Sequence, residues 1–316
     1  MTRRQTASWF IAAAVLLYCV VVVIDRFAYH RPAFMASVPV LDAGQWLLTG
    51  LLALSAAALV HGVLSFGGST RIAALPAPLV PWSQTDRWAA VVSLAIHVMC
   101  TGLLLDSPSW FNQIVLEDGL VEWASALFWF VACGLTLQAC RVLHRGNAPL
   151  LQWLLLGGLA GLFFLCGMEE VSWFQRVFQV EAPDALARVN MQGELNLHNL
   201  ATHPTENAFY NGMVVALVLI PALSALRVVD LDRWRLGLVA PRAHLVVVGT
   251  VATGWNFNKW NIPLFQLALF VSLLIVLAMA SRTADRFDKR LLHATAAATL
   301  LAQAIFLIFG DHFVRI

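Results

Sequence analysis

The chain of 316 residues is 60% hydrophobic and only 12% charged, and its mean hydropathy is +0.75. Soluble domains carry about 25% charged residues, so this composition excludes an ordinary soluble protein. The formal net charge of +2 gives no indication of a nucleic-acid partner.

Nine long apolar segments follow one another along the chain. A helix needs about 20 apolar residues to cross the hydrocarbon core of a bilayer, and the segments approach this length. They predict an all-α, polytopic transmembrane helix bundle in one integral membrane domain, residues 1–316. The predicted spans are 9–24, 41–64, 88–105, 120–140, 150–167, 209–226, 236–255, 262–280 and 291–309. The limits of the seventh are uncertain, since Arg242 lies within it.

The distribution of charge predicts the orientation of the chain. If the amino terminus is cytoplasmic and nine spans alternate, most of the 20 Lys and Arg residues fall in cytoplasmic loops, as the positive-inside rule requires. Most Asp and Glu residues then fall on the opposite face. We therefore expect a bacterial inner-membrane protein with a cytoplasmic amino terminus and an extracytoplasmic carboxyl terminus.

The predicted outer loop, 169–207, concentrates more polar chemistry than the rest of the chain. Glu169, Trp173 and Arg176 are spaced i, i+4, i+7, which would place them on one face of a helix that continues past the fifth span. Apolar residues fill the opposite face, as in an amphipathic helix at the membrane interface. A purely structural interpretation, in which Glu169 pairs with Arg176, is equally compatible with this pattern.

Further along the same loop, polar and apolar residues alternate. This period of two predicts an extended stretch with its polar side chains on one side. Amides and a histidine in this arrangement could bind a head group, or could satisfy the backbone of their own loop. The polar members are Asn190, Gln192, Glu194, Asn196 and His198, with Asn199 directly after them.

A second outer loop contributes two acids at the start of the fourth span. Asp118 and Glu122 are four residues apart and share a helix face. Asp118 is favoured by the helix dipole alone. Glu122 falls just inside the predicted membrane, where an acid needs a partner or a function.

These residues form one candidate site. We predict Glu169, Glu170 and His198 as the catalytic residues, and Glu170 with His198 as ligands of a divalent metal such as zinc, although the cofactor is unknown. The predicted substrate-binding residues are Asp118, Glu122, Trp173, Arg176, Asn190, Gln192, Glu194, Asn196 and Asn199.

Three strings in these loops, EDGLVEW, EEVSWFQR and NMQGELNLHN, resemble motifs of a family of uncharacterised bacterial multi-pass membrane proteins. The family patterns are EDGxxE, EExSWxQR and NxQxExNLHN. The resemblance highlights the same residues and implies no particular reaction.

The sequence therefore predicts an outward-facing site that acts on membrane lipid or a lipid-linked substrate, by hydrolysis or group transfer. It has no phosphate-binding glycine loop and no dinucleotide fingerprint, which argues against nucleotides. A non-catalytic partner in an envelope assembly and a transporter are the alternatives.

Overall fold

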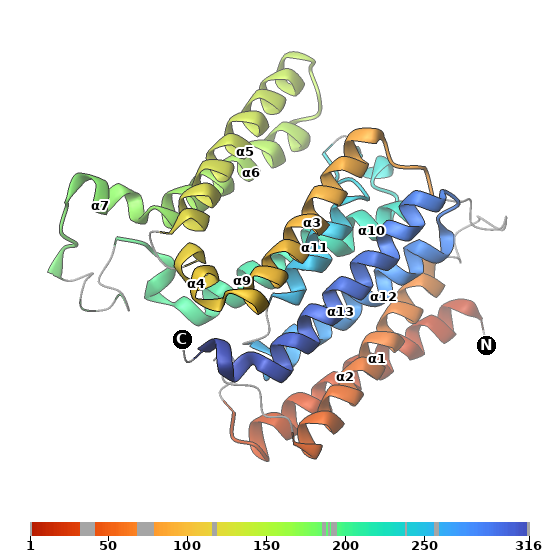
Figure 1. Ribbon diagram of the computed structural model, residues 1–316. Helices are drawn as coiled ribbons and strands as arrows, with labels where there is room; N and C mark the ends of the chain where they lie inside the picture. Colours follow the sequence, from red (N-terminus) through yellow and green to blue (C-terminus); the bar gives the residue numbers. More distant parts are fainter. Residues whose placement is uncertain are drawn as a thin grey trace. The chain divides into compact units, whose positions relative to one another are not determined.

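The computed structural model describes residues 2–31, 42–67, 79–115, 119–184, 188, 190, 195–237, 239–255 and 259–314 (Figure 1). All regular structure in these residues is helical. Eight helices are long and apolar enough to cross a membrane, and they correspond to eight of the nine predicted spans. The predicted class, a polytopic helix bundle, is confirmed. The eight candidate spans are Arg4–Phe27, Ala43–Phe66, Gln84–Asp106, Leu120–Arg145, Leu150–Glu170, Thr202–Ala225, Pro263–Arg282 and Arg286–Phe309.

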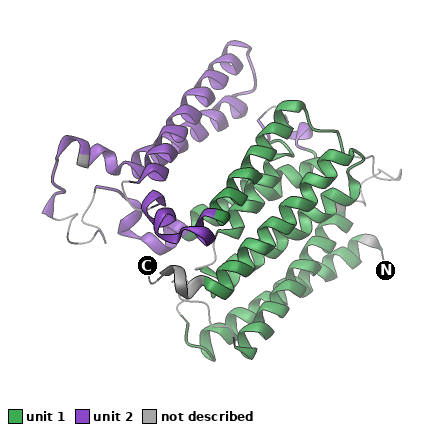
Figure 2. Ribbon diagram, in the orientation of Figure 1, with its two compact units in different colours: residues 1–102, 207–230, 241–316 green, residues 103–206, 231–240 purple. Residues whose placement is uncertain are grey.

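The chain divides into two compact units (Figure 2). Unit 1 comprises residues 1–102, 207–230 and 241–316, and unit 2 comprises residues 103–206 and 231–240. The candidate site defined by the polar outer loop belongs to unit 2.

Unit 1 is built around helix α12 (Pro263–Arg282), which packs against α2 (Ala43–Gly67), α11 (Leu245–Gly254) and α13 (Arg286–Val314). Helix α1 (Arg3–Phe27) covers α2. The residues at the centre are fully buried aliphatics such as Val276 and Met279. Because lipid chains are as apolar as these side chains, close packing rather than removal from water holds the spanning helices together.

Charged side chains join the beginnings of three helices at one end of unit 1. Arg87, near the start of α3 (Gln84–Asp106), donates from Nε to Asp288 Oδ1 of α13 at 2.7 Å. Asp86 of α3 accepts from Arg242, which precedes α11, at 3.0 Å. Because their first turns meet, α3, α11 and α13 begin at the same end of the unit. The predicted threading also places these three beginnings on one side of the membrane.

The predicted seventh span, 236–255, is a helix only at Leu245–Gly254. Ten residues rise about 15 Å, roughly half of the hydrocarbon thickness. Arg235 ends a short 3-10 turn in a left-handed conformation, with φ 58°, and turns occupy much of the stretch from there to α11. Apolar composition alone overestimated the length of this helix.

The sixth span is interrupted by a π-helical turn. Helix α9 (Thr202–Val214) continues through η3 (Val215–Leu219) into α10 (Ile220–Ala225). Pro221 lacks the N–H that would bond to the carbonyl four residues earlier, and a wider turn accommodates this loss. Gly249 lets α11 pack closely against η3, since a Cβ there would lie 2.6 Å from the Val218 side chain.

Unit 2 contains a hairpin of two apolar helices, α5 (Leu120–Arg145) and α6 (Leu150–Glu170). Gly146 and Pro149 end one helix and begin the next. Short elements follow the hairpin: η1 (Ser172–Phe174), α7 (Gln175–Phe178) and η2 (His198–Leu200). The unit also contains α4 (Pro108–Val115), which packs against α5, and η4 (Asp232–Trp234), and it includes the first residues of α9.

Candidate functional site

The site lies where α6 ends. Gly167 allows α6 to pack closely against α5, because a Cβ there would lie 2.9 Å from the Phe130 ring. This contact fixes the last turn of α6, which carries Glu169 and Glu170. The two adjacent carboxylates then have different partners.

We expected α6 to continue past Glu170 as an amphipathic helix, and this expectation was wrong. Ser172, Trp173 and Phe174 have φ angles of 44°, 56° and 59°, so three consecutive residues are left-handed. Each such residue costs about 1–2 kcal/mol. Beyond this turn the chain forms only the four-residue helix α7. Sequence spacing could not reveal this break, because none of the three residues is glycine or proline.

Contacts to neighbouring groups hold the left-handed turn. The Phe174 ring stacks on Phe130 of α5, with ring centroids 6.3 Å apart and an interplanar angle of 9°. The Trp173 indole Nε1 donates to Glu169 Oε1 at 2.7 Å. The predicted proximity of Glu169 and Trp173 is therefore correct, although a turn rather than a helix produces it.

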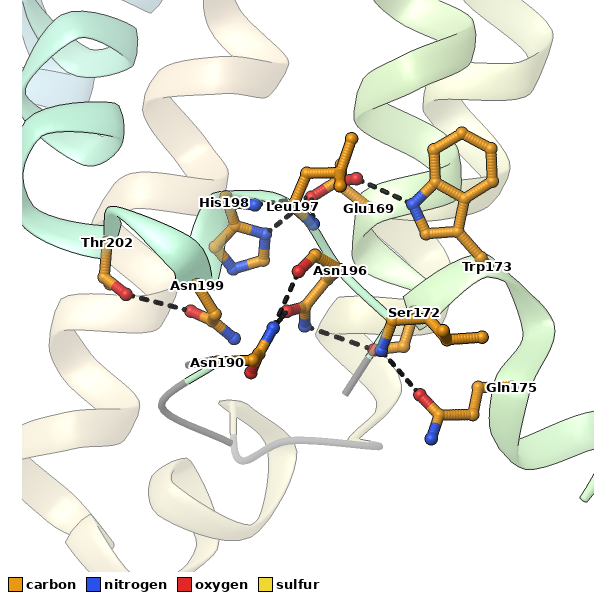
Figure 3. Close-up of polar contacts among 11 residues, drawn as sticks. Glu169, Ser172, Trp173, Gln175, Asn190, Asn196, Leu197, His198, Asn199 and Thr202 are labelled. Atoms are coloured by element: carbon orange, nitrogen blue, oxygen red, sulfur yellow. Dashed lines mark hydrogen bonds and ion pairs between the residues drawn. The ribbon is translucent and has the colours of Figure 1, made fainter. Parts of the chain in front are cut away.

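The Glu169 carboxylate is the centre of the site (Figure 3). Besides the Trp173 indole, its Oε2 accepts from the backbone N–H groups of Leu197 at 2.7 Å and His198 at 2.9 Å. The same oxygen lies 3.0 Å from His198 Nδ1. One carboxylate thus joins the end of α6, the left-handed turn and the loop that carries the histidine.

Amide side chains fix the same loop from the other side (Figure 3). Asn190 Nδ2 donates to Asn196 O at 2.7 Å and to Asn196 Oδ1 at 3.0 Å. Asn196 Nδ2 donates to Ser172 Oγ at 3.4 Å, and Gln175 Oε1 accepts from Leu195 N at 2.7 Å. Asn190 and Asn196 are buried, so we assign them to positioning the loop rather than to binding substrate.

The expected extended stretch is wrong at its carboxyl end. Leu197 has a helical backbone, with φ −82° and ψ −29°, and His198 begins the 3-10 helix η2. Asn199 is also buried there and accepts from Thr202 Oγ1 at 3.3 Å. Its predicted role in substrate binding stays a prediction.

Glu170 points to a different partner from Glu169. Its Oε2 accepts from Ser125 Oγ of α5 at 2.6 Å, and this hydroxyl also lies 2.8 Å from the carbonyl of Glu122. Glu170 and Glu122 are therefore linked through Ser125 at the end of the hairpin. The Glu122 side chain is half-buried in the first turn of α5.

Several predicted site residues fall in parts of the chain that the structure does not describe. Asp118, Gln192 and Glu194 lie outside the described residues, and so does the side chain of Arg176. Three further residues, Ser125, Ser172 and Gln175, contribute contacts that the sequence did not predict. A serine inside an apolar span and a glutamine next to an arginine carry no distinctive signal.

The described residues do not fit the predicted metal site. Among them, no group of three or more His, Cys, Asp or Glu side chains is arranged to hold a metal ion. The two predicted ligands also have different partners, because His198 contacts Glu169 whereas Glu170 contacts Ser125.

The geometry instead defines a carboxylate–histidine pair. If Nδ1 carries its proton toward Glu169, Nε2 presents a lone pair and can accept a proton from a substrate or a water molecule. The His198 side chain is 37% exposed, whereas that of Glu169 is 18% exposed. The carboxylate is thus sheltered while the imidazole remains accessible.

The chain is a multi-pass α-helical membrane protein with a carboxylate–histidine site at the end of an apolar hairpin. No protein-family model matches the chain, and neither a curated protein nor a solved structure is significantly similar to it.

Proposed function

We propose that the protein is a membrane enzyme that hydrolyses, or transfers a group from, the head group of a lipid or a lipid-linked substrate. The observation that supports this most directly is the 3.0 Å contact between His198 Nδ1 and Glu169 Oε2. In such a pair, the carboxylate orients the imidazole and stabilises the imidazolium that forms when Nε2 accepts a proton.

In the proposed reaction, His198 is the general base. Its Nε2 takes a proton from water or from an acceptor hydroxyl, which then attacks the head group, and the same nitrogen returns the proton to the leaving oxygen. Glu169 remains ionised throughout. General acid–base catalysis of this kind contributes about 10²–10⁴-fold to a rate.

A lipid-linked substrate suits the surroundings of His198. Leu197 is 55% exposed next to it, and Val177 and Phe178 are 54% and 71% exposed on α7, whose Gln175 accepts from Leu195 N of the same loop. The apolar hairpin α5–α6 ends at the same place. A substrate could keep its chains among apolar residues while its head group reaches the imidazole. We place this site on the extracytoplasmic face of a bacterial inner membrane, on the basis of the positive-inside rule.

The test compares wild-type protein with His198→Asn and His198→Gln. The Asn amide can replace the Nδ1 donor to Glu169 but cannot replace the Nε2 base. Purified protein is incubated with a total bacterial lipid extract, and lost and new species are measured by liquid chromatography and mass spectrometry. We expect the wild type to convert at least one lipid class and both variants to be at least about 100-fold slower.

His144→Gln is the matched control, because His144 is an exposed histidine at the other end of α5 in the same unit. It should convert lipid at the wild-type rate. A wild-type protein that converts no lipid, or a folded His198→Asn variant with full activity, would contradict the proposal.

One observation favours a second function, a non-catalytic partner in an envelope assembly. The Glu169 carboxylate is fully engaged in fixing its loop, which presents the exposed Leu197. On this alternative, His198→Asn keeps the loop in place and retains the partner, so co-purification from native membranes would be unchanged, while Leu197→Asp would abolish it.

A further inference from the structure

Unit 1 contains a row of buried polar side chains within its apolar bundle, far along the sequence from the loops with obvious chemistry. His97 of α3, Thr250 of α11, and Thr299 and Gln303 of α13 are each at most 4% exposed. In each, one buried polar atom has no hydrogen-bond partner: His97 Nδ1, Thr250 Oγ1, Thr299 Oγ1 and Gln303 Nε2.

These side chains lie along three facing helix surfaces. A Cβ at Gly254, the last residue of α11, would lie 3.2 Å from Thr299 Cγ2 and 3.4 Å from His97 Cε1. Thr250 precedes Gly254 by one helical turn, and Gln303 follows Thr299 by one turn. Since α3, α11 and α13 begin at the same end of the unit, the row runs along the helices rather than across them.

The energetic cost of these four unpartnered polar atoms indicates that internal water lies next to them. A buried polar group without a partner costs about 1–3 kcal/mol, and four such groups in one row would be a heavy cost for any bundle. Internal water can satisfy such atoms when each molecule finds two to four polar partners. The four unpartnered atoms of this row are the donors and acceptors to which such water would bond.

His97 gives this row a titratable group. Its Nε2 lies 3.4 Å from the carbonyl oxygen of Ala298, which favours a proton on Nε2 and leaves Nδ1 able to accept another. Its ring meets Trp255 edge-on, with centroids 5.5 Å apart, where α11 ends. The carbonyl end of a helix favours a positive charge. We propose that α3, α11 and α13 enclose a hydrated site in which His97 binds and releases a proton.

The electrostatic surroundings of His97 are simple. The titratable groups nearest to it along the three elements are Cys100 on α3, His293 on α13 and Lys259 beyond α11. None of these three groups is an acid that could pair with the imidazolium of His97. His97 and its neighbours belong to unit 1, whereas Glu169 and His198 belong to unit 2.

The first test is exchange of the histidine C2 hydrogen for deuterium, read for each histidine by peptide mass spectrometry of the full-length protein. This exchange requires water and passes through the imidazolium, so its pH profile reports proton binding. We expect His97 to exchange with a sigmoidal pH profile whose midpoint lies at or below about pH 6.5. His144, which is exposed, is the internal control. Exchange at His144 without exchange at His97 would overturn the proposal.

The second test is whether one substitution, Thr299→Val, lowers or raises Tm. If water bonds to the Thr299 hydroxyl, Thr299→Val removes that bond, lowers Tm and slows exchange at His97. In a dry row the same change would remove an unsatisfied hydroxyl and raise Tm, which would also overturn the proposal. Thr295→Val is the matched control on the same helix, since its hydroxyl donates to Leu291 O at 2.8 Å. It should leave exchange at His97 unchanged.

Discussion

The imidazole of His198 lies 3.0 Å from the carboxylate of Glu169, although 29 residues separate them in the sequence. The contact depends on two backbone features that bring the chain back to the end of α6. One is the left-handed turn at 172–174, and the other is the helical turn that begins at His198. Glu169 connects both, because it accepts from Trp173 and from the Leu197 and His198 amides.

Glu169→Gln should release the loop that carries His198. The amide keeps one neutral oxygen in place of two charged ones, so the hydrogen bonds from the backbone N–H groups of Leu197 and His198 lose the negative charge that strengthens them. Since one hydrogen bond to a charged group is worth about 1.5–3 kcal/mol, we expect amide hydrogen exchange at these two residues to become about tenfold faster or more. Mass spectrometry of the peptide containing them measures this.

The neighbouring Glu170→Gln is the control for this change. Glu170 contacts Ser125 of α5 and no described residue of the loop, so exchange at Leu197 and His198 should remain at the wild-type rate. Equal effects of the two substitutions would show that general damage to α6, and not loss of the Glu169 contacts, releases the loop.

Gln179→Gly should stabilise the protein. Gln179 ends α7 in a left-handed conformation, with φ 51°, and its side chain is exposed. Glycine adopts this conformation without the Cβ clash, and it is the preferred residue at such helix ends. We expect a gain of about 0.5–1 kcal/mol in the free energy of unfolding, measured as a higher Tm. Gln179→Ala keeps the Cβ and should give no such gain, so an equal gain from alanine would contradict the explanation.

The site shows what sequence reasoning could and could not predict. The helices of the hairpin were predictable because lipid imposes length and composition on a span. Glu169, Glu170 and His198 were identifiable because acids and histidines are rare in such a chain. It was not predictable that His198 contacts Glu169 and not Glu170, because the two glutamates are adjacent and equivalent in the sequence. Which one faces the loop depends on the angle at which α6 ends beside α5.

The two backbone errors have a common physical origin. Periodicity predicted a helix through Trp173 and an extended stretch through His198, and in both places side-chain contacts override local preference. Stacking of Phe174 on Phe130 and the hydrogen bonds to Glu169 stabilise conformations that these residues would not adopt alone. The short helix α11 of unit 1 is a similar error, because the apolar segment 236–255 predicted one long helix but contains turns before Leu245.

Asp288→Asn should weaken the end of unit 1 where three helices begin. Asp288 is only 1% exposed, and it accepts from Trp82 N at 3.0 Å as well as from Arg87. Asparagine removes the negative charge that accepts from Arg87 and Trp82, while Arg87 keeps Asp285 at 3.0 Å, so we expect the loss of one charge-assisted hydrogen bond, about 1.5–3 kcal/mol in the free energy of unfolding. Arg242→Ala is the comparison, because Arg242 pairs with Asp86 but its side chain is 70% exposed. It should cost at most about 1 kcal/mol, and similar losses from both variants would contradict this account.

His244 should make the protein less stable in mild acid. Burial lowers the pKa of His244 below 6.5, and Arg242 acts in the same direction, while Asp86 at 3.1 Å opposes them. The unfolded chain therefore takes up a proton near pH 6.5 before the folded protein does. Stability then falls as the pH drops below about 6.5, and the loss ends below the pKa of the folded state.

The measurement is Tm between about pH 8 and pH 5 for the wild type and His244→Asn. We expect the variant to lose less Tm across this range, and His144→Gln, at an exposed position, to follow the wild type. Asp285 does not interfere, because the backbone N–H of Asp288 and the Arg87 guanidinium hold its pKa below 3.8. Its contribution is lost only in stronger acid, below about pH 4. Parallel curves for the wild type and His244→Asn would show that the buried imidazole does not limit stability in this range.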